Sequence, residues 1–429
     1  MASRSWWIML ILIGPLVGVS FIDAVRTYGE LSGYNGTAAG VGEAFSPLVG
    51  IWAPTFSACE LVAAFLLPFV VIRLVAGDRH SGALKLEMQR SLSPLTRIGT
   101  KAVVLLTAWV IATMAPLTAV ALWRYYGGDI YPPELATVAV GHLLNAGLTV
   151  ALASAAGMIA NHPSTAAIAT LSVTVGTWVL DFIAAVHGGV WARLAEYTPI
   201  AMVSQFQHGL IRLDLTAAGL TLIAGGLALA AVWMQLGRSL RVRLTQSLVL
   251  GAAIVAVLAV SARVPGSWDL SENRMNSFPL ADEHALSTIH EPLRITVYLA
   301  PEDPRRTDLE RNTFSKLRRV MPDFDVTYVA STGTGLFEQT REHYGELHYQ
   351  LGSRQTVNRS TTVEGVLESI YSLAHHDLAE TGEDDGDERE TVFRGHPLAA
   401  HPTGAAFVFY GAWPAVTLLA ALRKRRRGS

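Results

Sequence analysis

Polar residues inside long apolar stretches are the first candidates for chemistry in this sequence. Glu60 lies near the middle of one apolar run, and Asp181 lies in the outer half of another. His142 and Asn145 lie one helical turn apart, on one face of a third. Such groups are costly inside a membrane, so all four are candidates for an intramembrane pathway. The alternative is hydrogen bonding between helices or a protonated carboxyl. We favour that alternative for His142 and Asp181, whereas Glu60 is the strongest candidate for a pathway or gating role.

A polar segment at 75–100 is the second candidate. Gly77 and Gly82 have the spacing of a phosphate-binding loop, but Ala83 and Leu84 stand where such a loop needs Lys and Ser or Thr. The segment therefore does not predict a nucleotide site. Its apolar residues predict a short amphipathic helix that lies on the membrane surface or docks into a partner. A solvated loop whose cations only fix the topology is the alternative.

The composition indicates which elements must position these residues. The chain has 429 residues, of which 51% are hydrophobic and 16% are charged. Soluble domains average about 25% charged residues, so a membrane protein is favoured. The net charge of −2 gives no basic field for nucleic acid. Cys59 is the single cysteine, which excludes a disulfide framework and a cysteine-based metal site within one chain.

Eight apolar segments are long enough to cross a bilayer, which takes about 20 residues each. They are Trp6–Val25, Val49–Leu74, Ala102–Trp123, Leu135–Ala160, Ser164–Val186, Ala217–Leu236, Leu248–Val264 and Ala405–Leu422. The first is interpreted as an uncleaved helix rather than a signal peptide, because its apolar run is long and further spans follow. Lysines and arginines concentrate on one set of connections, which predicts that both chain ends are cytoplasmic and that residues 265–403 are extracytoplasmic.

The predicted fold is a mostly α-helical polytopic membrane protein, with about eight transmembrane helices and a small α/β extracytoplasmic domain between the last two. Residues 1–245 form a six-span membrane domain, and residues 246–264 form the seventh helix. Residues 265–375 form the α/β domain, residues 376–403 an acidic linker, and residues 404–429 the last helix with a basic cytoplasmic tail. The membrane in question is the inner or plasma membrane.

The α/β domain is predicted from alternating and helical patterns. The expected elements are a strand at Leu293–Ala300, a helix within Asp308–Met321, a parallel strand at Phe324–Ala330, a hairpin at Tyr344–Val357 that turns at Gly352-Ser353, and a helix begun by a Thr361/Glu364 capping box. The order of elements is thioredoxin-like, but dithiol chemistry is excluded without cysteine. His375 and His376 beside carboxylates can bind a metal weakly, although a solvated tether is favoured. No catalytic residue, cofactor or metal site is predicted.

The 75–100 segment resembles the cytoplasmic loop of type-2 ABC exporter permeases. The residues that carry this resemblance are Asp78, Arg79, Gly82, Ala83, Leu84, Lys85, Leu86 and the Ser93-Pro94 step, followed by Lys101. Ala83 replaces the family's Thr, Lys85 replaces its Glu, and Pro94 stands later than usual. The stretch Tyr197–Thr216 is similar to the family's short outer helices. The resemblance implies that the loop couples to a separate ATPase subunit, which binds the ATP, and that the chain works as a homodimer or with a second permease.

The start of the outer domain resembles the auxiliary domain of gliding-motility-type ABC transporters. The matching residues are Asp269, Leu270, Ser271, Glu291, Pro292, Ile295, Thr296, Val297 and Tyr298. The last span with its arginine-rich end is also similar, whereas the outer region is shorter than is usual in that family. We therefore expect a permease subunit of an ABC transport system, with export favoured. A non-transporting scaffold that passes ATPase-driven movement to envelope or motility proteins is the alternative. A membrane enzyme is disfavoured.

Overall fold

The computed structural model describes residues 4–31, 46–77, 92–187, 189–235, 237–264, 266–272, 274–300, 303–321, 323–329, 343–374 and 397–427. The chain divides into two compact units. The helical unit comprises Met1–Glu272 and Val392–Ser429, and the α/β unit comprises Asn273–Thr391. Each is described by itself below.

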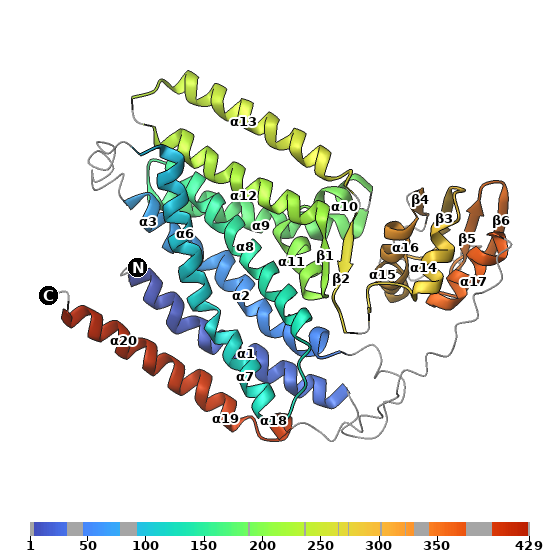
Figure 1. Cartoon of the computed structure of the whole chain (residues 1–429), viewed down its shortest axis with the longest axis horizontal. Helices are drawn as coiled ribbons and strands as arrows, with labels where there is room; N and C mark the ends of the chain where they lie inside the picture. The colour runs from blue at the N-terminus through green and yellow to red at the C-terminus, as the bar shows by residue number, and fades with distance from the viewer. Residues whose placement is uncertain are drawn as a thin grey trace, which may run out of the picture. The chain divides into compact units, whose positions relative to one another are not determined.

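Eight helical segments of the helical unit are long and apolar enough to cross a membrane, as expected for a multi-pass membrane protein. They are α1 (Arg4–Leu31), η1-α2-α3 (Leu48–Trp52, Ala53–Phe65, Leu67–Val75), α6-α7 (Pro94–Ala112, Met114–Tyr125), α8 (Pro132–Ile159), α9 (Pro163–His187), α12 (Leu213–Met234), α13 (Leu240–Ser261) and α19-η3-α20 (Thr403–Ala406, Phe407–Ala412, Trp413–Arg427). The eight predicted apolar spans thus correspond to eight helical segments that are long and apolar enough to cross a membrane. Figure 1 shows their arrangement.

Prolines account for the interruptions within these segments. The π-helical turns η1 and η3 end two residues before Pro54 and Pro414, and the breaks at Leu66 and Thr113 lie two and three residues before Pro68 and Pro116. A proline lacks the N–H of the normal helical hydrogen bond, and its ring collides with the carbonyl four residues earlier. A wider turn or a break just before the proline relieves that collision.

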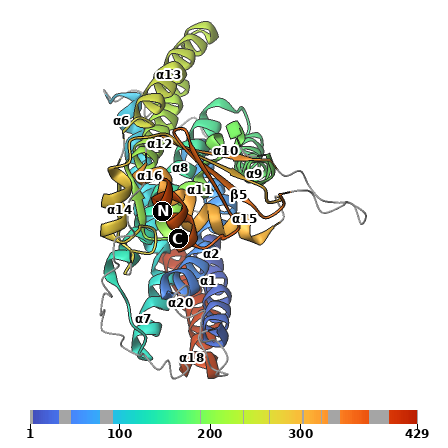
Figure 2. The same ribbon diagram turned by 90° about the vertical axis from the view of Figure 1, so that its right-hand side faces the viewer.

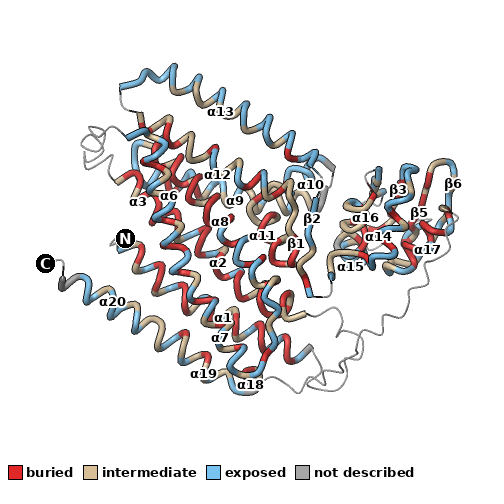
Figure 3. The backbone as a smooth tube through the Cα atoms, in the orientation of Figure 1, coloured by how far each residue is buried: buried red, intermediate tan, exposed pale blue. Residues whose placement is uncertain are grey.

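Helix α8 is the central helix of the helical unit, and it contacts α2, α3, α6, α9 and α12. Figure 3 shows buried residues along α8, whereas most of α13 is exposed. Small residues allow close packing: a Cβ at Gly219 of α12 would lie 2.9 Å from a methyl of Leu144, and one at Gly226 would lie 3.0 Å from the Cβ of Ala151. Glycine and alanine serve this purpose in membrane helix pairs, because they let two backbones approach.

The last helix returns to the first. Gly14 and Gly18 form a G-x-x-x-G pattern on α1, and Cβ atoms there would overlap Trp413 and Phe409. Trp413 Nε1 also donates a hydrogen bond to the Leu10 carbonyl, 2.7 Å away. Figure 2 shows α1 and α20 side by side. The C-terminal helix is therefore an integral part of the helical unit, although the α/β unit separates it from the other spans in the sequence.

Both ends of the chain lie at one end of the helical unit, together with the end of α3 and the connection from α12 to α13 (Figure 1). These helix ends carry cations, among them Arg73, Lys101, Arg241 and Arg243. Arginines of the opposite connections pair with carboxylates instead. Arg26 pairs with Glu30, Arg124 pairs with Asp129, and Arg212 pairs with Asp214. Cationic helix ends therefore gather at the first end of the helical unit, whereas these three arginines of the opposite connections lie in ion pairs.

The α/β unit holds a four-stranded sheet in the order β4-β3-β5-β6. Its strands are β3 (Leu293–Val297), β4 (Phe324–Tyr328), β5 (Leu347–Leu351) and β6 (Arg354–Asn358), and its helices are α14 (Leu280–Ser287), α15-η2-α16 (Pro304–Leu309, Glu310–Phe314, Ser315–Val320) and α17 (Val363–Ala374). The predicted parallel pair β3–β4 and the β5–β6 hairpin are confirmed. The predicted capping residue was one position early, because the hydroxyl of Thr362, not Thr361, accepts the N–H of Gly365.

Candidate functional site

A short helix that does not span the bundle organises the polar groups of the helical unit. Between α9 and α12 the chain forms α10 (Gly189–Ala195), α11 (Pro199–Gln207) and the short strand β1 (Leu210–Arg212). Thr198 caps α11, since its hydroxyl accepts the N–H of Ala201 at 3.2 Å. Pro199 at the first helical position suits that start, because its missing N–H would have no helical partner. The sequence Tyr197–Thr216 therefore yields one short helix and a strand before α12, with α10 as a second short helix ahead of it.

The C-terminal end of α11 joins two of the predicted residues. Gln207 Nε2 donates to Glu60 Oε1 at 2.5 Å, and it lies 3.3 Å from His142 Nε2. Glu60 Oε1 accepts one hydrogen of the Gln207 amide, and the second hydrogen of that amide is available to the imidazole. Glu60 on α2 and His142 on α8 are thus bridged by one side chain from a third helix.

This bridge lies deep within the helices that carry it. Glu60 follows Leu48 by twelve residues, or about 18 Å of helix, and His142 follows Pro132 by ten residues, or about 15 Å. Both positions therefore lie well inside their 28-residue helical segments, far from either end. His142 is 1% exposed and Gln207 is 9% exposed. The ring of Phe56 covers the imidazole, with 5.4 Å between ring centroids.

The imidazole leaves one polar atom unsatisfied. If His142 Nε2 accepts from Gln207, neutral imidazole carries its proton on Nδ1. Within the described part of the chain, His142 Nδ1 has no hydrogen-bond partner. A buried donor without an acceptor costs about 1–3 kcal/mol, so this atom is a position where a water or another polar group can bind.

The other end of α11 is fixed by Asp181. Its Oδ1 accepts a hydrogen bond from the Thr198 hydroxyl at 2.9 Å, about 14 Å along α11 from Gln207. Asp181 therefore does not contact Glu60, but both carboxylates hold the same short helix. Asn145 lies one turn beyond His142 on α8, and none of the hydrogen bonds between described residues joins its side chain to Glu60, His142 or Asp181.

A close approach of backbones holds α11 against α8. A Cβ at Gly141 would lie 2.4 Å from the Cβ of Phe206, so only glycine fits beside this helix. Gly141 directly precedes His142, and Phe206 directly precedes Gln207. The same contact therefore sets the distance between the imidazole and the amide.

The strand after α11 connects it to the chain that leads into the α/β unit. β1 pairs antiparallel with β2 (Ser267–Asp269), and Leu270 donates a backbone hydrogen bond to Gly209 at 2.9 Å. Glu134, the acidic residue in the first turn of α8, accepts the backbone N–H of Glu272 at 2.7 Å. Residues 267–272 are therefore joined both to the strand that follows α11 and to the first turn of α8.

The predicted coupling residues Asp78, Arg79, Gly82, Ala83, Leu84, Lys85 and Leu86 lie outside the described residues. Pro94 is the first residue of α6, and Ser93 caps that helix by accepting the N–H of Thr96 at 3.1 Å. The Ser93-Pro94 step thus starts the third span.

Sequence reasoning missed Gln207 and Thr198. Thr198-Pro199 has the pattern of a helix start, which was a usable signal. No sequence signal marked Gln207, because a polar residue near a helix end is ordinarily solvated. Comparison with models of protein families, with curated proteins and with solved structures gave no match to this chain.

Proposed function

We propose that the chain is the membrane permease subunit of an ABC transport system, that it works in export, and that a separate ATPase drives it through the 75–100 segment. The Glu60–Gln207–His142 bridge carries this proposal. It gives three helices a shared polar contact at mid-depth, and such contacts mark substrate or proton paths in transporters. The hydrogen bonds at 2.5 and 3.3 Å come from a short helix that is separate from the long helices.

The distribution of cations supports the proposed orientation. Positively charged loops stay in the cytoplasm, and the cationic helix ends of this unit gather on one side. We assign that side to the cytoplasm of a cell membrane, with both termini and the 75–100 segment on it. An ATPase subunit there would meet this segment, and a homodimer or a second permease would complete the path. No nucleic acid takes part, and the chain itself binds no ATP.

A scaffold that moves outer proteins without transporting cargo is the second candidate. One observation favours it: α11 continues into β1, and β1 pairs with β2 at the entrance to the α/β unit. ATPase-driven displacement of α11 would then reach the outer domain directly.

The test uses the chain and its ATPase, purified together and reconstituted in lipid vesicles. Glu60→Gln keeps the side-chain shape and removes the charge. We expect it to reduce ATP-driven cargo movement at least 10-fold while the complex stays assembled. Glu196→Gln, which alters a half-exposed carboxylate that pairs with Arg212, is the control and should transport normally. Unchanged transport by Glu60→Gln would remove the bridge from the mechanism.

The same vesicles separate the two candidates. A broad panel of labelled lipids, peptides and small solutes is followed during ATP turnover. Movement of any of them supports the permease. ATP turnover that moves none of them, but changes the hydrogen exchange of residues 267–272, supports the scaffold.

A further inference from the structure

The open face of the sheet in the α/β unit carries a group of imidazole and carboxylate side chains. Successive residues of a strand point to opposite faces. On β5, Leu347, Tyr349 and Leu351 point into the core that the helices of this unit cover. Glu346 and His348 point to the other face. His343 joins them from the turn before β5, where its φ of +77° is a left-handed conformation that histidine adopts more readily than most residues.

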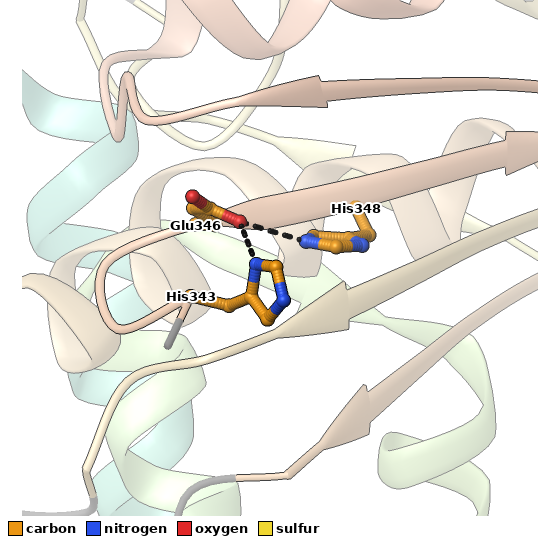
Figure 4. Close-up of side chains that lie close together, drawn as sticks. All are labelled: His343, Glu346 and His348. Atoms are coloured by element: carbon orange, nitrogen blue, oxygen red, sulfur yellow. Dashed lines mark hydrogen bonds and ion pairs between the residues drawn. The ribbon is translucent and has the colours of Figure 1, made fainter. Parts of the chain in front are cut away.

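The three side chains converge on one oxygen atom, as Figure 4 shows. His343 Nδ1 lies 2.8 Å from Glu346 Oε2, and His348 Nε2 lies 3.1 Å from the same oxygen. One potential ligand atom from each residue lies within 4.8 Å of the other two. Ligands around a zinc ion lie about 2.0–2.2 Å from the metal, and therefore roughly 3–3.5 Å from each other. The two measured distances already approach that separation.

Neighbouring groups hold this arrangement in place. Arg359 Nη2 binds the other carboxylate oxygen of Glu346 at 2.9 Å, so the carboxylate is oriented with Oε2 toward the imidazoles. The Tyr298 ring packs on His348 and His343, with centroids 4.8 and 5.9 Å away. Backbone bonds from Tyr298 to Glu346 and from Gly345 to Tyr298 fix the start of β5. Partners that orient the ligands in this way are typical of metal sites.

A network of surface ion pairs is the simpler interpretation, but it leaves the geometry unexplained. The Glu346 carboxylate accepts hydrogen bonds from Arg359, His348 and His343. His343 and His348 each use one ring nitrogen to bind the same oxygen of Glu346, although each ring could bind solvent water instead. Once each of these nitrogens gives up the proton that it donates to Glu346, two imidazole nitrogens and a carboxylate oxygen at these distances form a donor set that zinc prefers.

We propose that His343, Glu346 and His348 bind one divalent transition-metal ion, with zinc as the best fit. Three protein ligands leave the remaining coordination positions to water or to an external group. The ion would replace the imidazole protons that now face Glu346. This site is independent of the proposed transport function, because none of its residues belongs to the helical unit.

Metal binding to the full-length chain in chelator-free detergent tests the proposal. The probe is Zn²⁺ alone, titrated against a colorimetric competitor, with Co²⁺ absorption as a report on imidazole ligation. His375 and His376 are first replaced by alanine in all samples, so that this neighbouring pair cannot contribute. We expect one ion per chain, and at least 10-fold weaker binding in His348→Ala and in His343→Ala. His284→Ala, which removes an exposed histidine of α14, should bind as before.

Hydrogen exchange of each variant without metal shows whether the α/β unit is still folded. The strands β3, β5 and β6 should retain their protection in each variant, so weaker binding cannot be ascribed to unfolding. If a variant loses that protection, Glu346→Gln is used in its place, and it too should bind Zn²⁺ at least 10-fold more weakly. Equal affinity in the starting chain and in the folded variants overturns the proposal, as does the absence of stoichiometric binding.

Discussion

The two units each place a glutamate beside histidine, in opposite environments. In the helical unit an amide separates the two, and Glu60 and His142 meet only through Gln207. In the α/β unit two imidazoles contact Glu346 directly on the open face of the sheet. The buried group links three helices and leaves His142 Nδ1 without a hydrogen-bond partner among the described residues, whereas the second group directs two imidazole nitrogens at one carboxylate oxygen. We propose that the same residue types serve an internal path in one unit and an ion site in the other.

The largest expected effect comes from forcing α11 away from α8. Gly141→Val would place side-chain atoms inside Phe206, and overpacking of this kind costs about 3 kcal/mol at the upper end. The measurement is unfolding of the purified chain in mixed micelles with increasing detergent denaturant. Gly176→Val is the matched control, because a Cβ at Gly176 in α9 meets nothing within 4 Å. An equal loss of stability in Gly141→Val and Gly176→Val would contradict the role of the Gly141 contact.

Removing the bridging amide should have the next largest effect. Gln207→Leu leaves the Glu60 carboxylate and the His142 ring without their shared partner, at a cost of about 1–2 kcal/mol. A double-mutant cycle with Glu60→Gln measures the coupling in the same unfolding assay. Strict additivity of the two changes would show that the 2.5 Å contact contributes nothing.

A smaller loss is expected at the opposite end of α11. Thr198→Ala removes the cap and the hydrogen bond to Asp181, and the loss of a cap alone costs about 1 kcal/mol. Hydrogen exchange of residues 199–203 should increase. Thr198→Ser keeps the hydroxyl and serves as the control, so equal exchange in the two variants would rule out the cap as the cause.

The smallest effect is expected in the exposed group. His348→Ala without metal should leave the unfolding of the α/β unit unchanged, because ion pairs that solvent can reach contribute little, and the His348 side chain is 32% exposed. The readout is the hydrogen exchange of β3 and β5. A marked loss of protection would show that His348 stabilises the fold of the α/β unit, which would argue against a role confined to ligand binding.

Most helices and strands of the two units, and some of their polar residues, were predictable from the sequence. The remaining features depend on tertiary contacts. Apolar length predicted the long helices, and alternation predicted the sheet strands near Leu293 and Phe324. Glu60 and His142 were identified because charge inside an apolar run is costly. The bridge between Glu60 and His142 was not predicted. Gln207 lies 147 positions from Glu60 in the chain, and no hydrophobic periodicity marks it as a buried residue. His343, Glu346 and His348 were likewise missed, because neither their spacing nor their hairpin context matches a known metal motif.

The helix packing between the chain ends illustrates the same limit. The G-x-x-x-G pattern of Gly14 and Gly18 is visible in the sequence, but its partner is not. Only the structure brings Phe409 and Trp413 against these glycines. The α/β unit is inserted between these two partners in the chain, so no local pattern relates them.

Partnership with an ATPase is the central claim, and purification of the chain from its own cells tests it most directly. The tagged chain is extracted in mild detergent, and co-purifying polypeptides are identified by mass spectrometry. We predict an equimolar polypeptide with a phosphate-binding loop, and its loss when residues 78–86 are replaced by a glycine-serine linker while the helical unit stays folded. A chain that purifies intact without any ATPase, or that retains the ATPase after replacement of the loop, would contradict the account.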